Sequence, residues 1–158
     1  MNWFRIAALA AAASACTLPA AAQIINVRDP EQVAAMLRKE GYQAKVDPKK
    51  EGEDPVITSS ASGSTFGLYF YNCEAGKNCQ SVQFYAGFQE PKMDLAGVNA
   101  WNRDKRFGRA YLDKDGDVAI EMDLNIEPGG IPRELFVDSL EIWSRLVGEF
   151  RTRVYATQ

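Results

Sequence analysis

Hydrophobic residues recur at steps of three and four along the C-terminal part of the chain, residues 132–154. The stripe consists of Phe136, Leu140, Trp143, Val147, Phe150 and Val154, and it is widened on one side by Leu135, Ile142 and Leu146. This spacing predicts one long amphipathic helix that covers an apolar surface. The three widening residues lie at the edge of the stripe, and they are where we expect a homodimer contact.

Two stretches upstream alternate between apolar and other residues, which is typical of half-buried β-strands. The apolar positions are Phe66, Leu68 and Phe70 in residues 65–72, and Val82, Phe84, Ala86 and Phe88 in residues 80–88. A hairpin register that places Phe70 opposite Val82 also places Cys73 opposite Cys79. Because a slip of one residue would break both matches, we predict a hairpin pinned by a disulfide between Cys73 and Cys79.

A second hairpin is predicted from residues 106–112 and 118–126, which flank a run of aspartates, a lysine and a glycine. A three-residue turn with Gly116 in the left-handed region would align Ala110 and Leu112 with the apolar face, whereas a two-residue turn would align Phe107 and Tyr111. We favour the three-residue turn. In either case the alternation places Glu121 and Asp123 on the solvent-facing side of the strand.

Capping residues mark two shorter helices. Asp29 followed by Pro30 begins the first, which ends near Gly41. Asp94 begins the second, which runs to about Arg103 with Leu95, Val98 and Trp101 on its inner side; residues 42–46 and 56–62 complete the strands. The predicted order is α-β-β-β-β-α-β-β-α, an α+β two-layer sandwich with an antiparallel sheet of five to six strands and three helices.

The first residues are typical of an export signal, with a short basic segment, an apolar run and small residues before Gln23. We expect cleavage after Ala22, which makes residues 1–22 a signal peptide and 23–158 a single domain in the periplasm or outside the cell. The apolar run is far shorter than the roughly 20 residues needed to span a bilayer. A lipid anchor at Cys16 is a weaker alternative, because Ala13 stands where a lipobox has a large aliphatic residue.

Composition excludes several classes of function. The chain has 158 residues, a formal net charge of -3 and no histidine. Without a basic footprint, nucleic acid is not an expected partner, and without histidine a nucleophilic triad is not expected. Cys73 and Cys79 lack the second pair that a zinc site needs, so we expect a structural disulfide and no metal or cofactor.

Two groups of carboxylates could carry chemistry. Asp113, Asp115 and Asp117 suggest calcium, but the glycine and glutamate positions of an EF-hand loop are not matched, and a hairpin turn is the preferred interpretation. Glu121 and Asp123 have the spacing of a general acid and base on one strand face. Since no pocket is implied by the sequence, solvated surface charges are the simpler interpretation.

Three tyrosines, Tyr69, Tyr71 and Tyr85, fall together on the outer face of the first hairpin. Aromatic side chains on an exposed sheet face indicate an interaction surface. The alternative is that one of the helices covers them and they belong to the core. The pattern does not decide between the two.

Several short runs resemble one bacterial family. They are Trp101-Asn102-Arg103 through Phe107, Arg109-Ala110-Tyr111, Asp115-Gly116, Glu121-Met122-Asp123-Leu124 and Gln83-Phe84-Tyr85-Ala86-Gly87-Phe88. Together with the long last helix they resemble the YbjN family, which is labelled as sensory transduction regulators. The resemblance implies a fold similar to type III secretion chaperones, which are dimeric binding modules, and it implies no established catalytic residues.

These observations predict an exported, non-enzymatic protein-binding module of YbjN type, chaperone-like or regulatory. The protein partner is not identified by the sequence. The alternative is a periplasmic hydrolase that uses Glu121 and Asp123. The export signal and the pair Cys73 and Cys79 distinguish this chain from the better-known cytoplasmic members of the family.

Overall fold

A computed structural model describes residues 26–47 and 52–156. Its elements are α1 (Pro30–Lys39), β1 (Ala44–Val46), β2 (Val56–Ala61), β3 (Ser64–Tyr71), β4 (Ser81–Phe88), α2 (Leu95–Asp104), β5 (Arg109–Leu112), β6 (Val118–Asn125) and α3 (Arg133–Tyr155). This order confirms the predicted α+β succession. The predicted signal peptide, its cleavage after Ala22 and the alternative at Cys16 lie outside the described residues.

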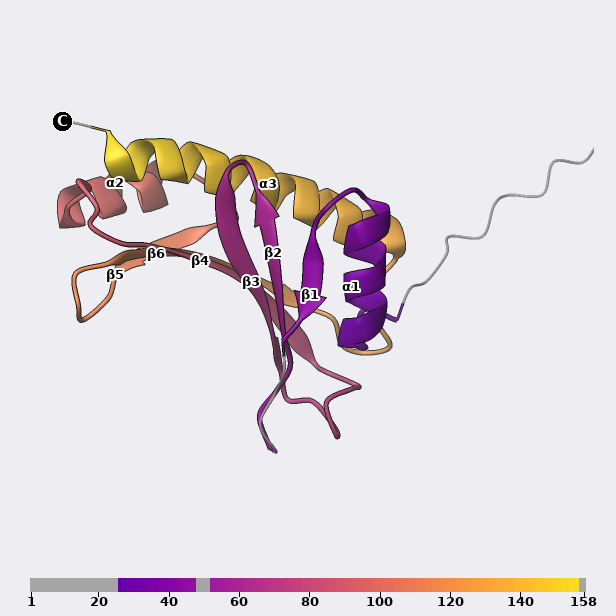
Figure 1. Ribbon diagram of the computed structural model, residues 1–158. Helices are drawn as coiled ribbons and strands as arrows, with labels where there is room; N and C mark the ends of the chain where they lie inside the picture. The colour runs from indigo at the N-terminus through magenta and orange to yellow at the C-terminus, as the bar shows by residue number, and fades with distance from the viewer. Residues whose placement is uncertain (1–25, 48–51, 157–158) are drawn as a thin grey trace, which may run out of the picture.

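The strands form one antiparallel sheet of six, and the three helices lie together on one side of it (Figure 1). The strand order is β1-β2-β3-β4-β6-β5, so the last strand in the sequence lies inside the sheet, between β4 and β5. In Figure 1, α3 runs along the sheet, α1 lies beside β1, and α2 lies at the opposite end. The fold is therefore a two-layer sandwich in which only one face of the sheet is covered.

The long helix provides most of the cover. Its fully buried residues are Phe136, Leu140, Trp143, Val147, Phe150 and Val154, the stripe that the spacing predicted. The Trp143 ring lies 5.8 Å from that of Phe66 and 5.5 Å from that of Phe84, centroid to centroid. Burial of these large rings against β3 and β4 is the main apolar contact between the layers.

The first hairpin has the predicted register. Leu68 pairs with Phe84 and Phe70 with Val82, and beyond the paired residues Cys73 and Cys79 form a disulfide. The chain preceding α1 packs on this end of the hairpin. Arg28 donates from Nε to the carbonyl of Cys79 at 3.0 Å, and the neighbouring Val27 is fully buried, so the segment before α1 is tied to the disulfide loop.

The second hairpin has the three-residue turn that we favoured. Asp113 and Asp117 are joined by a backbone hydrogen bond of 2.8 Å, and Gly116 between them has a φ of 85°. Ala110 pairs with Ile120 and Leu112 with Val118, so both face the helices. A left-handed residue closes such a turn, and glycine adopts that conformation without a steric penalty.

Two expectations about burial were wrong. Leu95 was expected on the inner side of α2, but it is 61 % exposed, because only Val98 and Trp101 of that helix are buried. Glu121 was expected to face solvent, but it is only 7 % exposed. Its burial depends on neighbours from β5, which are described below.

Candidate functional site: the open face of the sheet

The face of the sheet opposite the helices is uncovered by any element in the described part of the chain. We call it the open face. Its side chains come from alternate positions of the strands and include Thr58, Thr65, Tyr69, Tyr71, Gln83, Tyr85, Arg109, Tyr111, Glu121 and Asp123. Tyr69, Tyr71 and Tyr85 thus share one surface, as the sequence predicted, and Tyr71 is 40 % exposed.

Two of these tyrosines lie flat along their own strands. A Cβ placed on Gly67 would meet the Tyr69 ring at 2.6 Å, and one on Gly87 would meet the Tyr85 hydroxyl at 3.1 Å. The two rings meet edge to face, with centroids 5.7 Å apart. Because each glycine leaves room for a ring above it, the rings of Tyr69 and Tyr85 lie along the sheet instead of projecting into solvent. We call these two rings the tyrosine platform.

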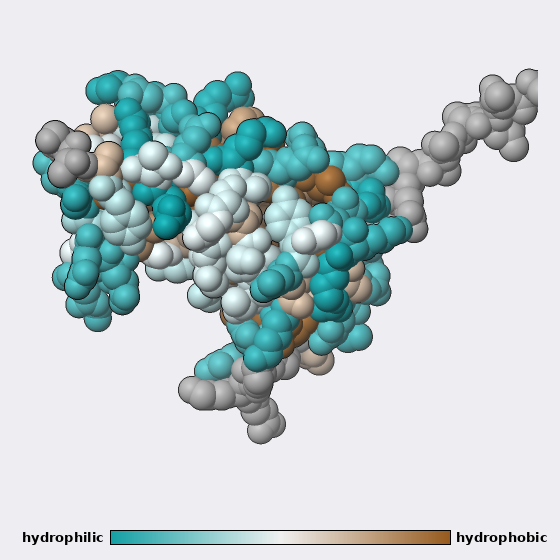
Figure 2. Space-filling model, turned by 45° about the horizontal axis from the view of Figure 1, so that its top comes forward, coloured by the Kyte–Doolittle hydropathy of each residue, from teal (hydrophilic) through white to brown (hydrophobic). Residues whose placement is uncertain are grey.

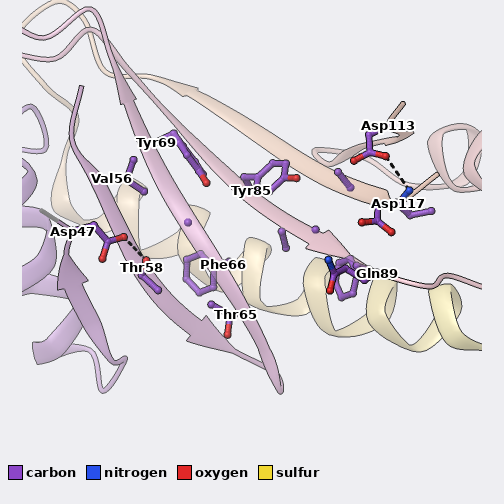
Figure 3. Close-up of a pocket in the computed structure, with 16 residues that line it drawn as sticks. Asp47, Val56, Thr58, Thr65, Phe66, Tyr69, Tyr85, Gln89, Asp113 and Asp117 are labelled. Atoms are coloured by element: carbon purple, nitrogen blue, oxygen red, sulfur yellow. Dashed lines mark hydrogen bonds between the residues drawn. The ribbon is translucent and has the colours of Figure 1, made fainter. Parts of the chain in front are cut away.

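A hollow of ≈ 460 Å³ lies beside this tyrosine platform (Figure 3). Four small residues from neighbouring strands lie along it, Thr65, Gly67, Gly87 and Ala119. Figure 3 shows Tyr69 and Tyr85 above the sheet, with Asp47 toward one end and Asp113 and Asp117 toward the other. The hollow exists because small side chains coincide at adjacent open-face positions on β3, β4 and β6.

Glu121 lies in the same surface and has two partners from β5. Its Oε2 forms an ion pair with Arg109, and its Oε1 accepts a hydrogen bond of 2.8 Å from the Tyr111 hydroxyl. Burial raises the pKa of Tyr111, and the hydrogen bond to Glu121 raises it further. The hydrogen bond that Arg109 donates to Glu121 likewise raises the pKa of Arg109. The carboxylate is therefore held as the acceptor of a fixed polar cluster.

A second chain of hydrogen bonds crosses the strands beside the tyrosines. The Tyr71 hydroxyl donates to Gln83 Oε1 at 3.0 Å, and Gln83 Nε2 donates to Asp123 Oδ1 at 2.9 Å. Burial and the nearby carboxylates of Glu121 and Asp123 raise the pKa of Tyr71. Tyr71 therefore stays neutral at physiological pH and acts here as a hydrogen-bond donor.

The open face carries more negative than positive charge. Among the described residues its carboxylates are Asp47, Asp113, Asp117, Glu121 and Asp123. Two cationic side chains belong to the same face by register, Arg109 opposite Glu121 and Lys45 opposite Thr58. Arg109 is committed to Glu121, and within residues 26–47 and 52–156 no side chain forms an ion pair with Asp47, Asp113 or Asp117.

The aspartate run after β5 forms a turn. Asp113 Oδ1 accepts hydrogen bonds of 2.9 Å from the backbone N–H groups of both Asp115 and Asp117. This is the local pattern by which aspartate stabilises a turn. Over residues 26–47 and 52–156, no group of three or more His, Cys, Asp or Glu side chains is placed to hold a metal ion.

The predicted dimer residues on α3 have different environments. Leu135 is 47 % exposed and Ile142 is half-buried, whereas Leu146 is 8 % exposed and belongs to the core. Figure 2 tilts the helix side toward the viewer and shows hydrophilic surface around a central area of intermediate hydropathy, with small hydrophobic spots. A homodimer contact through Leu135 and Ile142 stays a prediction, and Leu146 contributes to packing within the protomer instead.

Sequence reasoning located the tyrosines but missed the hollow and the Glu121 cluster. The hollow could have been sought from the small residues at Gly67 and Gly87, which interrupt the outward-facing aromatic positions of the first hairpin. The cluster could have been sought from the favoured three-residue turn, because the same register that aligns Ala110 and Leu112 with the apolar face places Arg109 opposite Glu121.

The described helices do not include one that is both long enough and apolar enough to cross a membrane. The fold and the open face together define a small two-layer α+β domain with one uncovered, polar and aromatic sheet surface. A family model matches residues 29–156, and the chain belongs to that family, YbjN, which is described as "putative bacterial sensory transduction regulator". Comparisons with curated proteins and with solved structures found no match.

Proposed function

We propose that this protein is an exported, non-enzymatic binding module of the YbjN family, and that it binds a protein partner on the open face of its sheet. The observation that carries the proposal is the uncovered platform of Tyr69 and Tyr85, with the exposed ring of Tyr71 on the same face. Tyrosine supplies a large, rigid contact area and a polar end at little cost in side-chain entropy, and it is enriched in protein interfaces.

The surroundings of the platform support a binding role. Gln83 and Asp123 hold the Tyr71 hydroxyl in place through the hydrogen bonds given above. A preorganised surface loses less conformational entropy when a partner binds. The family description, which names regulators, is consistent with a protein that acts by binding.

The hydrolase alternative has less support. A general acid or base needs a carboxylate that can reach a substrate, but both oxygens of Glu121 are engaged, by Arg109 and by Tyr111. Asp123 accepts a hydrogen bond from Gln83. Glu121→Gln and Asp123→Asn keep the size and hydrogen-bonding capacity of each side chain but remove the carboxylate. Each variant should complement a deletion strain if the protein only binds, whereas a hydrolase that uses either carboxylate would be inactivated.

Site-specific photocrosslinking in intact cells tests the binding proposal. A photoreactive phenylalanine analogue in place of Tyr71 should give a crosslinked adduct that mass spectrometry resolves into this chain and a partner. The same analogue in place of Glu141, an exposed residue of α3 on the helix side, is the matched control. No adduct at position 71, or the same adducts at both positions, would refute the open face as the binding surface.

A further inference from the structure

We propose that the hollow beside the tyrosine platform binds an arginine or lysine side chain from an extended segment of the protein partner. This inference rests on the proposed function and names the chemistry of the partner. It predicts a ligand that carries positive charge, a long flexible stem and a backbone that continues across the sheet.

The shape of the hollow suits such a side chain. Gly67 and Gly87 let the rings of Tyr69 and Tyr85 lie low along the sheet, and the hollow lies beside these rings. Thr65 of β3 and Ala119 of β6, which pairs with Gly87, add two small side chains to the lining of the hollow. An aliphatic stem can lie on this low surface while its charged end remains at the rim, which is the usual way in which Lys and Arg bury their methylene groups.

The carboxylates at the rim are available to a cation. Asp117 has no hydrogen bond or ion pair from its side chain to any residue in the described part of the chain. Asp47 accepts a hydrogen bond of 2.5 Å from the Thr58 hydroxyl but forms no ion pair with the described residues. Neither carboxylate thus has an ion-pair partner among the described residues, and a positively charged ligand would complement both ends of the hollow.

The tyrosine rings add a second attraction for a cation. Tyr69 and Tyr85 form one wall of the hollow, and no hydrogen bond fixes the hydroxyl of either ring within the described residues. The face of an aromatic ring attracts ammonium and guanidinium groups, by about 0.5–2 kcal/mol according to burial. Carboxylates and aromatic faces around one hollow thus favour the same kind of ligand.

The surface extends beyond a single side chain, which favours a segment of a protein. A second hollow of ≈ 280 Å³ lies on the other side of the same two rings and is lined by Tyr71, Gln83 and Glu121. Polar groups there can bind the backbone or the next outward side chain of an extended segment, since alternate residues of such a segment point the same way. A nucleic acid would be repelled by the carboxylates.

Fluorescence anisotropy with labelled synthetic peptides tests the proposal on the mature protein. The probe is a peptide in which arginine alternates with serine, and the control peptide has glutamate in place of arginine. We expect binding of the arginine peptide only. Asp117→Asn and Asp47→Asn should each weaken it about three- to fivefold at ~0.1 M salt, the scale of a partly exposed charge pair. Asp138→Asn, on the helix side, changes the net charge equally and should have no effect.

Replacement of the tyrosine ring separates the aromatic contribution from charge. Tyr69→Phe should keep the affinity, because the ring and not the hydroxyl faces the ligand, whereas Tyr69→Leu should lower it about threefold or more. Thermal unfolding of each variant verifies that the sheet is intact, and a variant that does not fold is replaced by the corresponding change at Tyr85.

The outcomes distinguish this inference from the binding function. The cation preference is wrong, and the binding function stands, if photocrosslinking at position 71 identifies a partner but the arginine peptide does not bind. The same conclusion follows if Asp117→Asn and the control Asp138→Asn have the same affinity for the arginine peptide. Binding of free spermidine without binding of the arginine peptide would also overturn the inference, because the ligand would then be a small amine. If no crosslink forms, the proposed function itself fails.

Discussion

The side-chain amide of Asn102 hydrogen-bonds both backbone groups of Ala110, donating from Nδ2 to the carbonyl at 2.9 Å and accepting from the N–H at 2.8 Å. Ala110 lies in β5, which forms one edge of the sheet. The amide thereby occupies the position that a further strand would take. An edge closed in this way cannot template pairing with another chain.

We predict that Asn102→Ala lowers the free energy of unfolding by about 1–3 kcal/mol, because it leaves two nearly buried backbone groups of β5 unsatisfied. Urea denaturation followed by tryptophan fluorescence measures this change. Arg103→Ala is the control, since among the described residues Arg103 pairs only with the adjacent Asp104 at the surface, and it should change stability by less than about 0.5 kcal/mol. Equal effects of the two substitutions would contradict the edge-closing role.

We predict that removal of the disulfide, as in Cys73→Ala with Cys79→Ala, lowers stability by less than about 3 kcal/mol, because the loop that it closes is short. The hairpin register should survive, since the pairs Leu68 with Phe84 and Phe70 with Val82 fix it independently. Amide hydrogen exchange measures protection in β3 and β4. Loss of that protection in the double variant would show that the disulfide, and not apolar pairing, sets the register.

We predict an alkaline loss of stability that depends on Tyr111. Its pKa is raised in the folded state by burial and by Glu121, so its contribution is complete below the unfolded tyrosine pKa of about 10 and is lost as the pH rises above that value. Urea denaturation between neutral pH and strongly alkaline pH measures this, with Tyr111→Phe as the comparison. Glu121→Gln should lower the pKa of Tyr111. The pKa is obtained from the ultraviolet absorbance change on tyrosine ionisation, after subtraction of the change measured for Tyr111→Phe. Titration of native Tyr111 near its ordinary pKa would contradict the cluster.

We predict that Trp143→Ala lowers stability by about 3–5 kcal/mol, because its fully buried ring leaves a cavity between α3 and the sheet. Trp143→Phe should cost less, since the indole N–H has no hydrogen-bond partner among the described residues and a ring remains against Phe66 and Phe84. Chemical denaturation compares both with Leu135→Ala at an exposed position of the same helix. A loss below about 1 kcal/mol for Trp143→Ala would contradict the burial of this ring between α3 and the sheet.

We predict that the mature protein begins at Gln23, because the residues before it have the small side chains of a signal cleavage site. Intact-mass measurement of the protein purified from an envelope fraction checks the terminus. Changing Ala20 and Ala22 to Arg should block cleavage, while changing Cys16 to Ser should have no effect. A mass that corresponds to an acylated Cys16 would establish the lipid anchor instead.

The success and failure of sequence reasoning follow from the range of the interactions involved. The register of the first hairpin was predictable, because adjacent strands with matching apolar faces and paired cysteines leave one solution. The burial of Glu121 was missed although the predicted register pairs it with Arg109, because alternation assigns a side chain to a face but does not say how far its neighbours cover it. Leu95 failed for a related reason, since the position of α2 over β5 leaves its first turn at the surface.

The sequence by itself determined the elements of this protein, their order and the stripe of α3 that covers the sheet, because periodicity and capping are local properties of the chain. Only the tertiary structure decided that β6 inserts between β4 and β5. That insertion places Glu121 beside Tyr85 and Ala119 beside Gly87, and so creates the hollow and brings the Glu121 cluster next to the tyrosines. Strand neighbours that are distant in sequence are selected by the packing of the whole sheet, which no local pattern encodes.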